Sequence, residues 1–198
     1  MRKPLLTLAA LVALAGLLVP AAVAARVSVR VEGRNKTIFG ALETRFEVGA
    51  NALQALDAAS LRGEFYYHVA QSSFGPYVDQ IGRFHAAGMS GWAFKVNGSS
   101  PPVGADKVQL RNGDRVLWYW ASFGPSGGPP TLLLTRTRRN CYRVVAENAQ
   151  GADTPAAGAF LHVDGRRVRT RNGRACVGRH FGAVRATRLG AVRSNALR

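Results

Sequence analysis

Residues 88–120 read GMSGWAFKVNGSSPPVGADKVQLRNGDRVLWYW, and this segment holds all three tryptophans of the chain. Two of its runs, GWAFKV at 91–96 and RVLWYWA at 115–121, alternate in the way typical of β-strands. The Asn-Gly steps at 97–98 and 112–113 are typical of tight hairpin turns. The segment therefore predicts strands joined by turns, and its aromatic residues are either the core of a sheet or a binding face.

The preceding sequence supplies further strands and one helix. Residues 26–32 (RVSVRVE) alternate cleanly, with Val27, Val29 and Val31 on one face. Residues 50–62 (ANALQALDAASLR) have helix-forming composition, and Gly63 follows as a stop signal. One helix packed on a mixed sheet indicates an α+β fold over residues 26–124, with the β-grasp pattern.

A different pattern follows the Gly/Pro-rich residues 125–130, which we interpret as a linker. Residues 131–198 contain only short alternating runs separated by Asp-Gly and Asn-Gly steps, and they need no helix. We expect a small all-β, immunoglobulin-like sandwich here. Cys141 and Cys176, the two cysteines of the chain, are expected to form a disulfide within it.

The first 25 residues have the features of a secretory signal peptide. Arg2 and Lys3 precede an apolar run at 5–19, and Ala22-Val23-Ala24 forms a small-residue cleavage site. An uncleaved membrane anchor is the alternative, but the apolar run is short for a membrane span. We therefore predict a bacterial protein that is secreted or held at the cell surface, without a transmembrane segment after cleavage.

The formal charge of +16 is concentrated in the second half of the chain. Residues 131–198 carry 14 arginines, no lysine and three acidic residues. One interpretation is a surface for acidic polymers; the other is a solvated face without a specific partner. Export argues against a specific nucleic acid as the partner.

Several motifs occur in the order of a known family. They are RVSVRVEG at 26–33, ALDAA at 55–59, GWAFKVNG at 91–98, VGAD at 103–106 and GDRVLWYW at 113–120. Together they resemble the transcobalamin-like C-terminal domain family over about residues 26–125. The resemblance implies a β-grasp-like fold, and in transcobalamin this domain covers one face of cobalamin. The large helical domain that holds the other face has no counterpart in this chain. Residues 158–168 and 172–174 more loosely resemble immunoglobulin-like or carboxypeptidase-regulatory-like surface modules.

The candidate ligand-binding residues come from the two tryptophan-containing strands. They are Trp92, Phe94, Lys95, Trp118, Tyr119 and Trp120. Alternation puts Trp118 and Trp120 on one face, where they can form an aromatic platform for a flat ring, a sugar or a peptide. In the alternative, these aromatic residues are the core under the helix, and Tyr119 and Lys95 face outward.

The sequence contains no recognisable catalytic or metal-binding motif. The four histidines are scattered, and neither a nucleophile elbow nor a phosphate-binding loop occurs. We therefore expect no enzyme activity, no metal and no required cofactor. The predicted function is an exported, non-catalytic binding or adhesion protein of the cell envelope. A cobalamin-type small-ligand binder and a polyanion-binding extracellular protein are the two alternatives.

Overall fold

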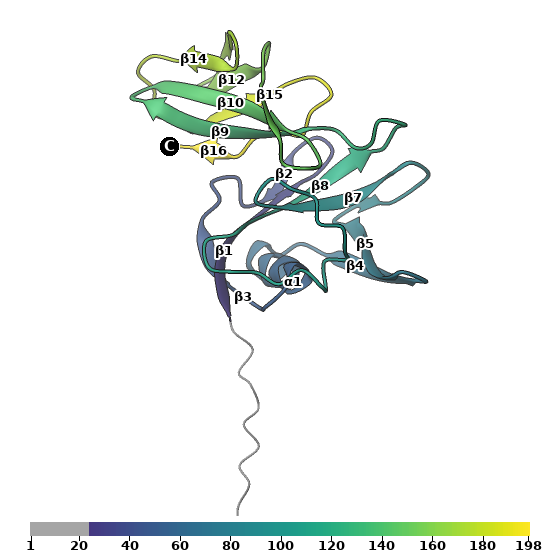
Figure 1. Ribbon diagram of the computed structural model, residues 1–198. Coiled ribbons are helices and arrows are strands. Elements are labelled where there is room, and N and C mark those ends of the chain that lie inside the picture. Colours follow the sequence, from purple (N-terminus) through teal and green to yellow (C-terminus); the bar gives the residue numbers. More distant parts are fainter. Residues whose placement is uncertain (1–23) are drawn as a thin grey trace, which may run out of the picture.

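The computed structural model describes residues 24–198, so the predicted signal peptide lies almost entirely outside the described residues. The described chain contains one helix and sixteen strands, which form four small sheets (Figure 1). The helix of the described residues has neither the length nor the apolar character needed to cross a membrane. Below, the N-terminal part denotes residues 24–124 and the C-terminal part denotes residues 131–198.

The elements of the N-terminal part are β1 (Ala25–Glu32), β2 (Thr37–Phe39), β3 (Arg45–Val48), α1 (Ala52–Gly63), β4 (Tyr67–Ser72), β5 (Gly75–Ile81), β6 (Phe84–His85), β7 (Ser90–Val96) and β8 (Arg115–Ser122). Those of the C-terminal part are β9 (Thr131–Arg138), β10 (Cys141–Glu147), β11 (Asp153–Pro155), β12 (Phe160–Val163), β13 (Arg166–Arg169), β14 (Arg174–Cys176), β15 (Val184–Thr187) and β16 (Ala196–Leu197).

A five-stranded mixed sheet forms the centre of the N-terminal part. Strand β1 runs parallel to β8, with Val31 opposite Trp118. Strands β2 and β3 pair antiparallel with the other edge of β1, and β7 pairs antiparallel with β8, placing Phe94 opposite Trp118. The two tryptophan-containing strands predicted from the sequence are thus direct neighbours, although eighteen residues, 97–114, separate them in the chain.

Helix α1 covers one face of this sheet. Asn51 caps its first turn, accepting a hydrogen bond from the Gln54 backbone while the Gln54 side chain accepts from the Asn51 backbone. The helix ends where Glu64 adopts a left-handed conformation with φ of 50°. Its buried residues pack with the three valines of β1, and each fully buried valine or leucine contributes about 1.5–3 kcal/mol. The buried apolar residues of α1 are Ala52, Ala55, Leu56 and Ala59.

The C-terminal part consists of two four-stranded sheets that enclose one core. One sheet has β10 at its centre, flanked by β9, β11 and β14, and the other runs in the order β13-β12-β15-β16. Their shared core includes Leu132, Tyr142, Val144, Leu161 and Val184. In Figure 1 this part lies against the face of the mixed sheet opposite α1. The predicted disulfide between Cys141 and Cys176 is present and joins β10 to β14.

The predicted fold class, an α+β β-grasp-like domain followed by a small immunoglobulin-like sandwich, is wrong. A mixed sheet with one helix is present, but the described chain is mostly β and divides among several small sheets. The physical reason is that α1 covers only one face of the mixed sheet. The other face is buried by β-strands of the C-terminal part, and β4, β5 and β6 form a separate three-stranded sheet. One helix, α1, is therefore too small a part of the described residues to make the fold α+β.

Candidate functional site

The face of the mixed sheet opposite α1 is buried, although it carries polar side chains. On β1, alternation places Ser28, Arg30 and Glu32 on this face, and each is less than 4% exposed. A second layer of strands covers them, so these groups must find partners at the contact between the N-terminal and C-terminal parts.

Glu32 is the centre of a charged network at this contact. Its Oε2 atom lies 3.1 Å from Nη2 of Arg193, and its Oε1 atom accepts a hydrogen bond from Arg185. Arg30 lies 3.5 Å from the same carboxylate, and Thr37 donates to it from the neighbouring strand. Burial lowers the pKa of both Arg30 and Arg185, and the nearby glutamates oppose that shift. The network fixes β1 against residues 185–193.

Lys95 makes a second polar contact between the two parts. Its Nζ donates to the backbone oxygens of Glu147 and Asn148, at 2.9 and 2.6 Å, and to Thr131 Oγ1 at 3.0 Å. These three acceptors match the three donors of an ammonium group. Burial lowers the Lys95 pKa to about 8, while the charges of Glu147 and Asp153 oppose that shift. Lys95 thus lies inside the contact between the two parts rather than on an outer face.

Four of the candidate aromatic residues, Trp92, Phe94, Trp118 and Trp120, lie on the helix side of the sheet. Trp118 is 2% exposed and stacks on Phe94 with ring centroids 5.0 Å apart. Trp92 is half-buried beside them, and its Nε1 donates to the Phe84 carbonyl at 2.8 Å. A cavity of about 120 Å³ remains between these rings and the loop at Gly104. The Trp118 Nε1 atom is enclosed and has no acceptor among the described residues.

The other two candidates, Tyr119 and Lys95, lie on the opposite face of the sheet. Tyr119 is buried on the opposite face with Leu117, Ala121 and Val192, and its burial raises its pKa. Trp120 is half-buried, and its ring meets Trp92 edge to face at 5.7 Å. The four aromatic candidates on the helix side pack on one another, with Trp118 buried, and Lys95 and Tyr119 lie on the opposite face, so the six do not form one exposed platform.

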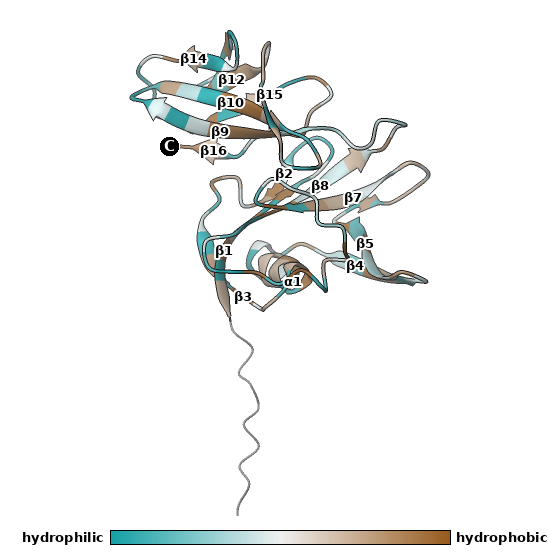
Figure 2. Ribbon diagram, in the orientation of Figure 1, coloured by the Kyte–Doolittle hydropathy of each residue, from teal (hydrophilic) through white to brown (hydrophobic). Residues whose placement is uncertain are grey.

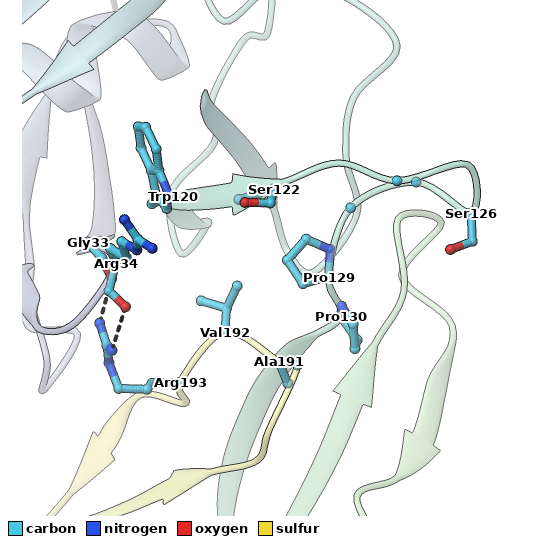
Figure 3. Close-up of a pocket in the computed structure, with 15 residues that line it drawn as sticks. Gly33, Arg34, Trp120, Ser122, Ser126, Pro129, Pro130, Ala191, Val192 and Arg193 are labelled. Carbon is cyan, nitrogen blue, oxygen red and sulfur yellow. Dashed lines mark hydrogen bonds between the residues drawn. The ribbon is translucent and has the colours of Figure 1, made fainter. Parts of the chain in front are cut away.

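A pocket of about 550 Å³ opens at the edge of the contact between the two parts (Figure 3). Trp120 and Arg34 line it from the N-terminal part, and Val192 and Arg193 line it from the C-terminal part. Its volume lies within the range of small-molecule sites. We name it the junction pocket.

The predicted linker forms a wall of the junction pocket. The backbones of Gly124 and Gly127 exchange two hydrogen bonds, of 3.1 and 2.9 Å, around a tight turn in which Gly127 has φ of 93°. Val192 is tied to the end of this segment, because its backbone N–H donates to the Pro130 carbonyl at 2.9 Å. Backbone hydrogen bonds therefore fix the Gly/Pro wall to the C-terminal wall.

The chemistry of the junction pocket suits binding. Trp120 lines one end of the pocket while its ring packs on Phe84 and Trp92 on the helix side of the sheet. Arg34 is an exposed cation at the same opening. The Arg193 guanidinium is already bonded to Glu32 and to the Gly33 carbonyl, as Figure 3 shows for the latter group. Among the described residues that line the pocket, none is a histidine, cysteine, aspartate or glutamate.

Sequence reasoning identified Trp120 but missed Arg34, Val192 and Arg193. Arg34 lies in a polar turn after β1, and nothing in its local sequence indicates that it approaches residues 190–193. This proximity depends on pairing between distant segments, which a local pattern does not encode.

A second polar cluster surrounds Asp79 on β5. His68 Nδ1 lies 2.7 Å from one oxygen of this carboxylate, and His85 Nε2 lies 3.2 Å from the other. Within residues 24–198, no group of three or more His, Cys, Asp or Glu side chains is placed to hold a metal ion.

Comparisons with known proteins add a family match for the N-terminal part. Residues 49–122 match a family model described as a domain of unknown function (DUF4430). Among solved structures, one similar chain is described as a "putative metal binding protein" from Ruminococcus gnavus. It is 15% identical with a TM-score of 0.40, and the match covers 50% of this chain and 99% of that one. No match was found among curated proteins.

Proposed function

We propose that this chain is an exported, non-catalytic binding protein of the cell envelope, and that its ligand occupies the junction pocket. The observation that carries the proposal is the composition of this pocket. It combines one free guanidinium with a fixed Gly/Pro wall and the apolar side chains of Ala191 and Val192, and the described residues that line it include no acid–base group. Such a lining can hold a molecule but offers no general base to activate Ser122 or Ser126.

The ligand class follows from the same walls. A flat ring can pack against Val192 and the Pro129–Pro130 wall, and an anionic substituent on that ring can reach the guanidinium of Arg34. We therefore propose a small, ring-containing anion. The resemblance to transcobalamin-like C-terminal domains supports small-ligand binding as a role of the N-terminal part, and cobalamin is the alternative ligand.

Calorimetric titration of residues 25–198 tests this proposal, with 4-hydroxybenzoate, cobalamin and a soluble neutral glycan as probes. The expected result is binding of the aromatic anion together with a change in tryptophan fluorescence. The Arg34→Ser variant should weaken that binding about tenfold, because a charge-assisted hydrogen bond contributes about 1.5–3 kcal/mol. Arg111→Ser, which removes an exposed arginine outside the pocket, is the matched control.

Two results would contradict the proposal. One is equal weakening by Arg34→Ser and Arg111→Ser, which would indicate a non-specific effect of charge. The other is turnover of a probe by the purified protein that a single substitution in the junction pocket abolishes. Binding of cobalamin in place of the aromatic anion would select the alternative ligand.

A further inference from the structure

The arginines of the C-terminal part are almost all free. Eleven of the fourteen are exposed, and within the described residues none of these eleven lies within 4 Å of an Asp or Glu oxygen. The acidic residues of this part do not neutralise them. Glu147 is buried at the contact with the N-terminal part, and Asp164 accepts hydrogen bonds from the backbone at Phe181 and Gly182.

Three of the free arginines line one concave surface. A cleft of about 510 Å³ is bordered by Arg138, Arg171 and Arg174, and the Cys141–Cys176 disulfide forms part of its lining. We name it the arginine cleft. In Figure 2, β9 is hydrophobic next to the N-terminal part and hydrophilic at its opposite end, where Arg138 ends the strand. The cleft is therefore on the part of the surface away from the junction pocket.

The backbone fixes the positions from which these three arginine side chains extend. Arg171 and Arg174 flank a two-residue turn and exchange two backbone hydrogen bonds of 2.9 Å, with Asn172 and Gly173 both at positive φ. Arg138 Nε lies 3.4 Å from Cys141 Sγ, which holds this side chain beside the disulfide and leaves its two Nη groups free.

The strand pair that carries Arg174 also has an uncompensated electrostatic cost. Arg143 on β10 lies directly opposite Arg174 on β14, two residue pairs away from the disulfide along the ladder. Like charges directly across a sheet destabilise it, and here no described carboxylate lies within ion-pair distance of either one. A bound anion would remove this repulsion.

We infer that the arginine cleft binds a phosphate-bearing linear polymer. The three guanidinium groups come from separate backbone positions and surround a concave space, so the ligand must accept hydrogen bonds from several directions. A tetrahedral phosphate does so, whereas a planar carboxylate accepts mainly in one plane. The other exposed arginines extend the positive surface along which such a polymer can continue. This site shares no lining residue with the junction pocket, so it does not depend on the function proposed there.

The test measures binding of inorganic polyphosphate to residues 25–198 over a range of salt concentrations. Poly-L-glutamate of matched charge is measured in the same way as the carboxylate-bearing polymer for comparison. The triple variant Arg138→Gln, Arg171→Gln, Arg174→Gln removes the cleft. Arg166→Gln, Arg169→Gln, Arg179→Gln is the matched control, with the same loss of charge at exposed positions that do not line the cleft.

The expected result is that polyphosphate binds more tightly than polyglutamate and that the cleft variant weakens its binding more than tenfold. The salt slope should also fall by about 2, since each single-strand phosphate contact contributes about 0.7. The control variant should retain most of the polyphosphate affinity and most of the salt slope. Equal losses in the two triple variants would overturn the inference in favour of diffuse charge, and tighter binding of polyglutamate would overturn the phosphate assignment. Arg34→Ser should leave polyphosphate binding unchanged, which separates this result from the junction pocket.

Discussion

Glu32 and Arg193 are 161 residues apart in the chain, and the Arg193 guanidinium binds the Glu32 carboxylate inside the contact between the two parts. Arg185 binds the same carboxylate, and Arg30 is shared between Glu32 and Glu43. The fully buried Glu32 carboxylate therefore has three arginine partners, which are Arg30, Arg185 and Arg193. Neither part by itself contains a complete set of partners for these charges.

Glu32→Gln should lower the free energy of unfolding by about 3–5 kcal/mol, because it leaves buried guanidinium groups without their anion. Urea unfolding followed by fluorescence measures the loss. Glu47→Gln, at an exposed position on the neighbouring β3, is the control and should change stability by less than about 0.5 kcal/mol. A loss no larger than that of the control would show that the network does not hold the two parts together.

Lys95 should make stability rise with pH above neutrality. Its pKa is about 8 in the folded protein and 10.5 in the unfolded chain, so between these values the unfolded chain binds the extra proton. Stability should therefore increase from about pH 8 to about pH 10, relative to a Lys95→Met variant measured under the same conditions. Titrating groups common to both proteins cancel in this difference. Parallel pH profiles would contradict the assignment.

Replacing both Cys141 and Cys176 by alanine should cost about 4 kcal/mol of stability. The disulfide closes a loop with a sequence separation of 35, and chain-entropy estimates for loops of this order give that magnitude. Thermal or urea unfolding measures the loss. The alanine variant should be insensitive to dithiothreitol, whereas the native protein should lose a similar amount of stability on reduction.

Trp118→Phe should be less damaging than the buried position of this side chain suggests. Its Nε1 has no acceptor among the described residues, so the substitution removes ring volume without leaving a carbonyl unpaired. Trp92→Phe removes ring volume as well, but it also leaves the Phe84 carbonyl without its donor. For the same loss of ring volume, we expect Trp92→Phe to lower the free energy of unfolding by about 1 kcal/mol more than Trp118→Phe. A direct comparison of the two unfolding free energies tests this. A larger loss for Trp118→Phe would contradict the role assigned to the indole N–H.

Local sequence predicted much of the secondary structure. The valine alternation on β1, the segment of α1 and the two tryptophan-containing strands all occur close to their predicted bounds. The turn at Asn97-Gly98 also forms, with both residues at positive φ. This turn does not join β7 directly to β8, however. The Asn97 side chain instead donates to Asp114 and accepts from the Arg115 backbone across the sheet.

The site was predictable only in part. Trp120 was identified from the aromatic alternation, yet Lys95 and Tyr119 were expected to face outward if the tryptophans formed the core. Both are buried because the C-terminal part covers that face of the sheet, and its strands begin more than ten residues after Tyr119. A period-2 pattern shows that a strand has two faces, but it does not show what covers the polar one.

The parallel pairing of β1 with β8 has a consequence for the order of folding. β1 is synthesised first among the described strands, yet one of its neighbours becomes available only at residue 115 and the partners of its buried charge only at residues 185 and 193. Such long sequence separations give a high contact order and slow folding. One edge of β1 must therefore stay unpaired while most of the chain is synthesised. A chaperone that shields this edge during that interval would raise the yield of folded protein.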